Sequence, residues 1–267
     1  MPELPEVEWV RRQLEPLVVS RRVVAGWGHD SPKFAQAPAA VGAEITGVAR
    51  RGKYLLIGLD DARELIVHLG MTGRLRPRPE PSETDRYVRA WWRLDDGMIL
   101  ELRDVRRFGR VAVVEAGDHR SLPTLAALGP EPWDPSLDGD GFWRRLRSSR
   151  SRIKSQLLSQ RPIAGVGNIY ADEGLWRAEV HPALRSLTRR QASRLLEGVR
   201  DALEVGLANG GTTLRDYRTP DGNQGRNQSA LRAYGRAGAP CERCGTLLQS
   251  RVYDARTATF CPTCQHR

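Results

Sequence analysis

The sequence lacks several features that would place it among membrane or exported proteins. It contains no stretch of about eighteen apolar residues, so we expect no membrane-spanning helix and no membrane partner. Its first residues are acidic and no apolar signal region follows them, so we expect no secretory signal and a cytoplasmic location. Cysteine is also scarce, and its only four copies fall in two closely spaced pairs near the end of the chain.

Lysine is the scarcest of the common charged residues. Lysine and arginine together number 42 and give a net charge of +10, yet lysine occupies only positions 33, 53 and 154. The basic balance indicates a polyanionic partner, although an arginine-rich proteome would produce the same balance. Because the two cations are not interchangeable, Lys53 and Lys154 draw attention by falling within recognisable motifs. Lys33 has no such context, and we expect an ordinary surface residue there.

The length of 267 residues suggests two domains, each with its own core. Residues 1–115 combine a leading helix with strands, and the glycine- and proline-rich residues 116–136 are typical of a linker. Helical patterns dominate residues 137–236, and residues 237–267 form a separate small module. The sequence therefore predicts an α+β multidomain protein, which we expect to be a monomer.

Hydrophobic patterning locates the main elements. Short runs rich in Val, Ile, Leu and Trp predict strands of an antiparallel sandwich or barrel at residues 48–59, 64–70, 89–94, 98–105 and 110–115. Residues 77–83 read as a loop. Apolar spacings of three and four predict helices at residues 142–146, 153–158, 169–178 and 188–208. Thr188, with Gln191 three residues later, predicts the N-cap of the last helix.

The first eight residues, Met-Pro-Glu-Leu-Pro-Glu-Val-Glu, place unusual chemistry at the start of the chain. Removal of the methionine would leave Pro2 with a secondary amine whose pKa is roughly 8, so that much of it would be neutral and nucleophilic near physiological pH. Such an amine condenses with a masked aldehyde, such as C1′ of a sugar, to give an iminium. Glu3 and Glu6 would supply acid and base groups beside it.

The same stretch also fits a purely structural role. Pro5 suits the first turn of a helix. Apolar residues then recur at spacings of three and four, as on the buried face of an amphipathic helix, at Val7, Val10, Leu14 and Leu17. Both interpretations can hold together.

All four cysteines lie in one pattern, Cys241-x2-Cys244-x16-Cys261-x2-Cys264. Two such knuckles at this separation predict one structural zinc ion held by four thiolates, which leaves no open position for water. Two disulfides are the alternative, and the absence of a secretory signal disfavours them.

Two expected turns could enter a nucleic acid. Met71 lies between two glycines after His68, and Arg106 and Phe108 lie in a second turn between strands. An apolar wedge with an arginine can replace the stacking lost when a base is extruded and can bond the orphaned partner base. Taken alone, both stretches can equally be ordinary turns.

Taken together, the motifs resemble the bacterial formamidopyrimidine-DNA glycosylases, which excise oxidised purines. The resemblance rests on six ordered matches: the first eight residues, residues 51–56, 68–73, 106–109 and 165–170, and the cysteine quartet. Leu4 favours this branch over endonuclease VIII, where glycine is expected. The resemblance implies an N-terminal β-sandwich with a leading helix, a helical domain with a helix–two-turns–helix element, and a zinc finger with four cysteine ligands.

It also implies a bifunctional glycosylase and abasic-site lyase acting on damaged double-stranded DNA, associated with the bacterial nucleoid. Pro2 would form the Schiff base, Glu3 would protonate the sugar oxygen, and Glu6 would assist. Lys53 would contact the sugar-phosphate and transfer a proton, although a solvent-facing lysine at a strand edge is the alternative. Arg256 would grip a phosphate and donate a proton in the second elimination.

The remaining expected contacts to DNA also come from the resemblance. Met71, Arg106 and Phe108 would fill the gap left by the base, with Arg106 facing the orphaned cytosine. Asn168, expected to cap a helix after two glycines, would bind a phosphate. The other expected DNA-binding residues are His68, Arg89, which stands where histidine is usual, and Lys154, which matches a phosphate-facing lysine.

One departure from the family pattern affects specificity. Arg226-Asn227 stands after Gly225, where an aromatic pair is usual in the loop over the extruded base, so stacking surface is lost there. The preferred lesion and the opposite base are therefore open. The alternatives are an endonuclease VIII-like enzyme for oxidised pyrimidines and a DNA-binding paralogue without catalysis, the latter favoured only if Met1 stays attached.

Overall fold

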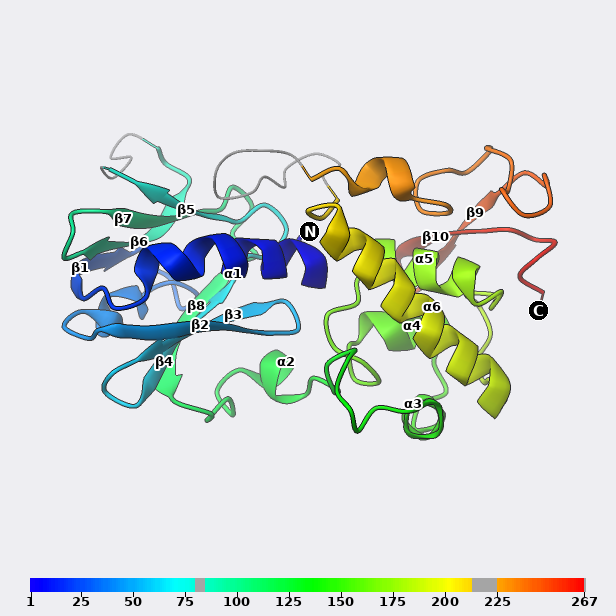
Figure 1. Ribbon diagram of the computed structural model, residues 1–267, viewed down its shortest axis with the longest axis horizontal. Helices are drawn as coiled ribbons and strands as arrows, with labels where there is room; N and C mark the ends of the chain where they lie inside the picture. The colour runs from blue at the N-terminus through cyan, green and yellow to red at the C-terminus, as the bar shows by residue number, and fades with distance from the viewer. Residues whose placement is uncertain (80–84, 213–224, 267) are drawn as a thin grey trace. The chain divides into compact units, whose positions relative to one another are not determined.

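The computed structural model describes residues 1–79, 85–212 and 225–266 (Figure 1). The chain divides into two compact units: the first holds Met1–Ala126 and Asn209–Arg226, and the second holds Ala127–Ala208 and Asn227–Arg267. The sequence predicts one helical domain at residues 137–236, whereas Asn209–Arg226 group with the first unit. Among the described residues, no helix has the length and apolar character needed to cross a membrane.

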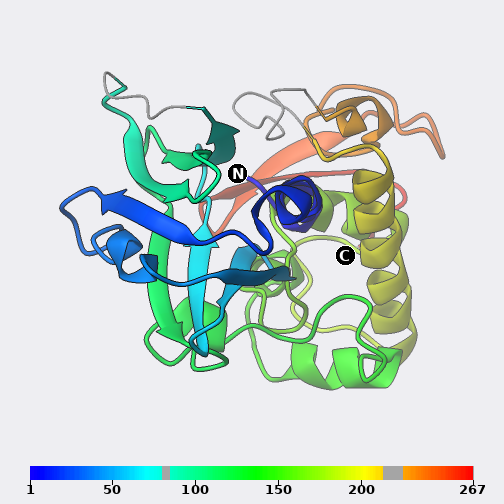
Figure 2. The ribbon, with the colours of Figure 1, turned by 60° about the vertical axis from the view of Figure 1, so that its left-hand side comes forward.

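The first unit is built on two four-stranded antiparallel sheets, which confirms the expected sandwich (Figure 2). One sheet has the order β1-β6-β7-β5, with strands β1 (Val23–Gly28), β5 (Arg74–Arg78), β6 (Val88–Leu94) and β7 (Ile99–Arg103). The other has the order β2-β3-β4-β8, with strands β2 (Ile45–Arg51), β3 (Tyr54–Leu59), β4 (Arg63–His68) and β8 (Arg110–Glu115).

Local residues explain where the strands differ from expectation. The run 48–59 is two strands, because Gly52 has a φ of 57° and forms a two-residue turn with Lys53 between Arg51 and Tyr54. Strand β5 extends to Arg78, into the expected loop. It tolerates Pro77 because it is an edge strand and needs fewer backbone donors.

Helix α1 (Leu4–Val18) contacts β2 and β5, which are edge strands of different sheets. Val7, Val10 and Leu14 are buried as expected. Leu17 is 39% exposed, however, and Val18 is fully buried in its place. The expectation for Leu17 was wrong because a period of 3.6 residues brings the position four after Leu14 back to the buried face. This packing holds the start of the chain against the sandwich.

The second unit is mainly helical and ends in a two-stranded hairpin. Its elements are α3 (Gly139–Arg147), α4 (Ile153–Leu158), α5 (Asn168–Arg177), α6 (Arg189–Ala208), β9 (Gln249–Tyr253) and β10 (Arg256–Phe260). Helices α5 and α6 pack closely at glycines, since a Cβ on Gly174 would lie 2.6 Å from Cγ2 of Val199. Thr188 and Gln191 exchange the two bonds of a capping box, which confirms the predicted start of α6.

The remaining short elements lie at the joins between these structures. In the first unit, the 3-10 helix η1 (Ala37–Ala40) follows β1, and α2 (Pro123–Ala126) lies within the expected linker. In the second unit, the 3-10 helix η2 (Asn227–Ala230) contacts α6.

Candidate active site and nucleic-acid interface

The start of the chain is buried and ordered by two carboxylates. Pro2 is buried, and Glu3 and Glu6 are 2% and 1% exposed. The backbone N–H of Glu3 donates to Oε2 of Glu6 at 2.8 Å, and the reciprocal bond completes a capping box at the N-terminus of α1. Pro2, expected to form the iminium, and Glu3, expected to protonate the sugar oxygen, are therefore both buried at the start of α1.

Glu6 also holds a second part of the first unit. Its Oε1 accepts the backbone N–H of Thr212 at 2.6 Å, while its Oε2 accepts that of Glu3. Gly211, at a φ of 82°, packs so closely that a Cβ there would lie 2.9 Å from Oε1 of Glu6. Both oxygens of Glu6 thus accept bonds from backbone N–H groups, and a role for Glu6 in proton transfer stays a prediction.

Lys53 lies in the turn between β2 and β3 and is only 3% exposed, so it is not a solvent-facing edge residue. It lies close enough to His68 to affect the titration of the imidazole. Burial lowers the pKa of His68 to about 4, and the positive charges of Lys53 and Arg110 contribute to this shift, against the opposing charge of Asp104. His68 is therefore neutral near pH 7 and can act as a hydrogen-bonding group.

The geometry around His68 fixes its orientation. Its Nδ1 accepts the backbone N–H of Gly70 at 3.2 Å. Its ring packs against the ring of Tyr54, with the centroids 4.5 Å apart. The bonded Nδ1 leaves Nε2 as the nitrogen that can carry the proton and donate to a ligand.

Asp104, which no sequence motif singles out, is a buried aspartate that joins the two expected wedge turns. Asp104 is 0% exposed; its Oδ1 accepts from Oγ1 of Thr72 at 2.5 Å and from the backbone N–H of Arg106 at 3.2 Å. Its Oδ2 accepts the backbone N–H of Gly109 at 2.7 Å. The turn with Met71 and the turn with Arg106 and Phe108 are therefore held side by side by one carboxylate.

Phe108 has the properties expected of a wedge. Its side chain is 48% exposed, and the guanidinium of Arg106 lies 4.8 Å from its ring centroid. The ammonium of Lys33 lies 5.8 Å from the same centroid and donates to the carbonyl oxygen of Arg107 at 2.8 Å. Lys33, expected to be an ordinary surface residue, is half-buried and adds positive charge to this tip. Met71 is half-buried beside the tip.

The side chain of Arg89 is buried and does not face solvent. It is 3% exposed, its Nε donates to the carbonyl oxygen of Asp104 at 2.9 Å, and its Nη1 donates to that of Arg86 at 2.9 Å. Burial lowers the pKa of Arg89 below its ordinary value. Arg89 thus supports the Asp104 turn from behind, and a phosphate contact by Arg89 stays a prediction.

In the second unit, Arg256 lies where a phosphate could reach it. It is the first residue of β10, directly after a two-residue turn at Asp254 and Ala255, and its side chain is exposed. Both turn residues have positive φ values, 49° and 61°, as a tight hairpin turn requires. The hairpin therefore presents the guanidinium of Arg256 at its tip.

Lys154, in contrast, points into the protein. It is 1% exposed; its Nζ donates to Oδ1 of Asp172 at 2.6 Å and to the carbonyl oxygen of Thr257 at 2.5 Å. Burial raises the pKa of Asp172 to about 6, although the ammonium of Lys154 and the backbone N–H of Thr259 oppose this shift. These contacts point the ammonium of Lys154 into the protein, whereas the resemblance predicts that it faces a phosphate.

Asn168 opens α5 but does not cap it. The N-cap is Gly167, in an extended conformation, so the prediction of Asn168 as the N-cap was wrong by one residue. Gly165, with a φ of 82°, bends the chain before the helix. Asn168 is half-buried, and its Oδ1 is buried with no hydrogen-bond partner. Its amide lies in the first turn of a helix, where an anion is favoured.

The four cysteines converge on one point, as their spacing predicted. The Sγ atoms of Cys241, Cys244, Cys261 and Cys264 all lie within 4.8 Å of one another. The Sγ atoms of Cys244 and Cys261 are 3.5 Å apart, far beyond a disulfide bond and near the separation of about 3.8 Å that tetrahedral Zn–S bonds require. The donor set fits a structural Zn²⁺, and the disulfide alternative fails.

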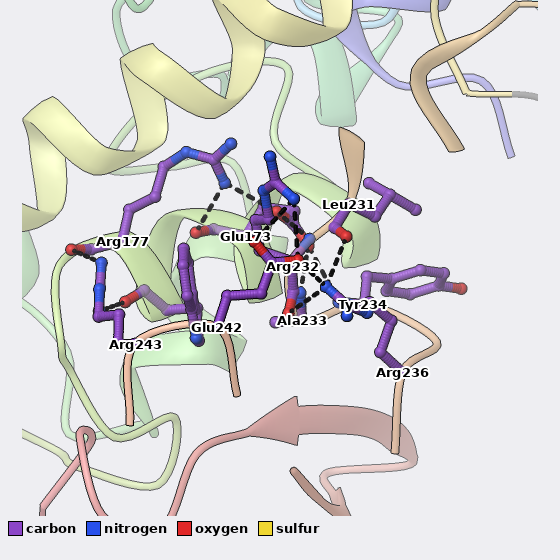
Figure 3. A network of polar contacts seen from close by, with 10 residues as sticks. Glu173, Arg177, Leu231, Arg232, Ala233, Tyr234, Arg236, Glu242 and Arg243 are labelled. Atoms are coloured by element: carbon purple, nitrogen blue, oxygen red, sulfur yellow. Dashed lines mark hydrogen bonds and ion pairs between the residues drawn. The ribbon is translucent and has the colours of Figure 1, made fainter. Parts of the chain in front are cut away.

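The buried carboxylate of Glu173 links α5 to residues 232–234, which precede the four-cysteine module (Figure 3). Glu173 is 2% exposed and accepts the backbone N–H groups of Arg232, Ala233 and Tyr234 at 2.8–3.1 Å. Arg177 balances its charge at 2.7 Å. Three successive amides aimed at one carboxylate resemble an anion-binding nest whose anion is a residue of the chain. The predicted helix at residues 169–178 gives no indication of this role for Glu173.

The loop expected over the extruded base lies partly outside the described residues. Residues 213–217, which match the family pattern, belong to the part that the structure does not describe. At its end, Arg226 is exposed and Asn227 is 2% exposed. The backbone N–H of Arg226 donates to the carbonyl oxygen of Asn209 at 2.9 Å, so these two residues are joined by a hydrogen bond.

Comparisons with known proteins agree with these features. Three family models match: the formamidopyrimidine-DNA glycosylase N-terminal domain over residues 1–111, its H2TH domain over residues 128–218, and a zinc finger found in FPG and IleRS over residues 238–267. The chain is 45% identical to the formamidopyrimidine-DNA glycosylase of Thermus thermophilus, covering 99% of this chain and 98% of that protein. It is 43% identical to that of Deinococcus radiodurans, covering 99% and 97%.

Solved structures give the same result. The crystal structure of MutM (Fpg) from Thermus thermophilus matches with a TM-score of 0.92, covering 99% of this chain and 98% of that one at 45% identity. A structure of MutM in complex with DNA containing carbocyclic 8-oxo-G matches with a TM-score of 0.89 at 33% identity, covering 100% of each chain. Lactococcus lactis Fpg bound to abasic-site DNA matches at 0.88 and 32% identity, covering 99% and 100%. The chain therefore belongs to the formamidopyrimidine-DNA glycosylase family and carries its four-cysteine zinc finger.

Proposed function

We propose that this chain is a bifunctional DNA glycosylase and abasic-site lyase that excises oxidised purines, 8-oxoguanine and formamidopyrimidines, from duplex DNA. The observation that carries the proposal is the buried start of the chain, where Pro2 and Glu3 are held at the N-cap of α1. A pure DNA-binding protein would need neither a buried imino acid at position 2 nor a carboxylate fixed beside it.

Base release begins with the liberated secondary amine of Pro2. Its lone pair attacks C1′, the bond from C1′ to the base nitrogen breaks, and the base leaves with a proton. Glu3 protonates the sugar ring oxygen, so that the ring opens and the amine nitrogen becomes an iminium. Lys53, buried at the turn after β2, contacts the sugar-phosphate with its positive charge and transfers a proton during the elimination that follows.

Strand cleavage follows from the iminium. It acidifies the C2′ proton, whose loss expels the 3′ phosphate in a β-elimination. A second proton loss then expels the 5′ phosphate in a δ-elimination, with Arg256 gripping the phosphate and donating a proton. Hydrolysis of the iminium regenerates the amine of Pro2 and leaves a one-nucleotide gap. The zinc ion stays structural, because four thiolates fill its coordination.

The DNA would be held by side chains from both units. Met71, Arg106 and Phe108 would occupy the space of the extruded base, and His68 and Asn168 would donate hydrogen bonds to phosphates. The named ligands of the matching structures, 8-oxo-G and abasic-site DNA, are consistent with this role. We further propose that the protein acts as a monomer in the bacterial cytoplasm, at the nucleoid.

Borohydride trapping on a duplex with an abasic site or 8-oxoguanine tests the proposal. The native chain should crosslink, and intact mass should show that Met1 has been removed. Pro2→Gly and Pro2→Thr should lower strand nicking at least about tenfold, whereas Pro79→Ala, at an exposed proline, should not. An unprocessed start without crosslinking would leave only a DNA-binding protein.

Specificity needs its own comparison. Release of 8-oxoguanine should exceed release of thymine glycol if the chain follows the purine branch. The opposite order would support the endonuclease VIII-like alternative, to which the polar Arg226 and Asn227 could contribute.

A further inference from the structure

Helix α4 holds the hairpin that carries Arg256. Arg152, the N-cap of α4, donates from Nη1 to Oδ1 of Asp254 at 2.5 Å, and Ser155 donates from Oγ to Oδ2 of Asp254 at 2.5 Å. Lys154, between them in sequence, donates to the carbonyl oxygen of Thr257. These contacts flank Arg256, because the side chain of Asp254 before it and the backbone carbonyl of Thr257 after it are both bound by residues 152–155.

A buried ion pair extends this attachment to α5. Lys154 and Asp172 are each 1% exposed, and their charged atoms are 2.6 Å apart. The other oxygen of Asp172 accepts the backbone N–H of Thr259 at 3.0 Å, so that α4, α5 and β10 meet at one pair of charges. His181 supports the same strand from behind, with its ring 4.6 Å from that of Phe260.

This arrangement conflicts with direct phosphate binding by Lys154. A phosphate contact needs an ammonium that solvent or DNA can reach, and this one is enclosed by a carboxylate and a carbonyl of its own unit. Moving it to a phosphate would leave Asp172 charged, buried and without its cation, which is strongly unfavourable.

We propose that Lys154 is a positioning residue: with Asp172, and with Arg152 and Ser155 on Asp254, it fixes the hairpin so that Arg256 meets the phosphate. Lys154 therefore affects DNA chemistry through Arg256 and makes no phosphate contact itself. This inference rests on the proposed function only in the role given to Arg256.

Rescue by a neutral pair distinguishes the two roles. Lys154→Met leaves a buried carboxylate unpaired, and we expect the δ-elimination product on an abasic-site duplex to fall about tenfold or more. Lys154→Met combined with Asp172→Asn removes both charges and keeps an acceptor for Thr259. We expect this double variant to return to within about threefold of the native chain. A lysine that binds phosphate would leave the single and double variants equally defective, and that result would overturn the inference.

Salt dependence gives a second readout that needs no catalysis. Affinity for a duplex with a stable abasic-site analogue should show the same slope of log Kd against log salt in the double variant and in the native chain. A slope smaller by about one would mean a lost phosphate contact and would also overturn the inference. Arg256→Gln should lower the slope, and Arg190→Gln, at an exposed residue of α6, controls for the loss of one charge.

Folding and the proposed function are monitored separately. Zinc content and thermal melting identify a variant that fails to fold. Asp254→Asn, at the 45% exposed partner of Arg152, perturbs the same attachment from the surface and should shift product from δ- to β-elimination. An unchanged product ratio would count against the inference. If the native chain itself does not trap, the proposed function fails, while the salt slopes still decide the role of Lys154.

Discussion

Each unit places a buried aspartate behind an exposed arginine, but the two aspartates have different partners. Asp104, behind Arg106, accepts only neutral donors, namely one hydroxyl and the backbone N–H groups of two turn residues. Asp172, behind the hairpin of Arg256, pairs with the ammonium of Lys154. Amides fix a turn through its own backbone, whereas an ion pair can join separate elements. Asp104 thus fixes the shape of the turn with Arg106 and Phe108, whereas Asp172 and Lys154 attach the hairpin of Arg256 to α4 and α5.

Removal of zinc should produce the largest difference in stability between the two units. Within the described residues the candidate metal cluster lies only in the second unit, and structural zinc contributes about 10–16 kcal/mol in isolated finger peptides. A chelator should therefore strongly reduce protection from hydrogen exchange in β9 and β10 while that of β3 and β4 persists. The loss should be smaller than in a peptide, because Glu173 and Asp172 still hold the module. Equal loss in both units would contradict this division.

Lys154→Met should cost about 3–5 kcal/mol of unfolding free energy, because it leaves the carboxyl group of Asp172 buried without its cation. Asp172→Asn tests the pH dependence of the same pair. The pH dependence has a definite sign. The pKa of Asp172 is raised from 3.8 to about 6, so its contribution to stability is full below pH 3.8 and is lost as the pH rises through 6. That slope should vanish in the variant when denaturant melts are compared from pH 4 to 7. A slope that persists would assign it to another group.

Asp104→Asn should be milder, at about 2 kcal/mol, because the remaining oxygen still accepts and no buried cation is left behind. The loss should appear as faster exchange at the amides of Arg106 and Gly109, with lower affinity for an abasic-site duplex. Asp118→Asn, at an exposed pair with Arg120, is the matched control. A cost equal to that of Lys154→Met would remove the distinction between amide and ammonium partners.

Lys53→Met should have the smallest effect on stability but a clear effect on titration. Removing this positive charge should raise the pKa of His68 above its value of about 4, although burial will keep it below 6.5. In the native chain the stability that His68 contributes is present above pH 6.5 and is lost as the pH falls through 4. Proton NMR of the imidazole measures both effects, and an unmoved pKa would mean that burial alone sets it.

The elements and residues with local signals were predictable from the sequence. The zinc ligands are evident from their spacing, the sandwich from short apolar runs, and the start of α6 from Thr188 and Gln191. Two edge strands were missed. Strand β1 (Val23–Gly28) has mixed burial, and β5 (Arg74–Arg78) carries three arginines and a proline, so neither shows the alternation that predicts a strand.

The residues that organise the site have partners far away in the sequence. Asp104 meets Thr72 across 32 positions, Lys154 meets Thr257 across 103, and Glu6 meets Thr212 across 206. A single chain without tertiary information gives no register for such pairs. The motif around Lys154 therefore predicts an outward, phosphate-facing lysine, and nothing in the sequence distinguishes Asp104 from other aspartates at strand ends.

The carboxylate of Glu173 has a practical consequence for anyone designing fragments of this protein. Glu173, on α5, accepts the backbone N–H groups of residues 232–234. A zinc finger excised at residue 238 would therefore lose this attachment to α5. Gln265 loses its anchor in the same cut, since its side chain donates to the carbonyl oxygen of Val180. A transplantable version has to begin upstream of α5, so the metal module and the helix beneath it form one exchangeable cassette.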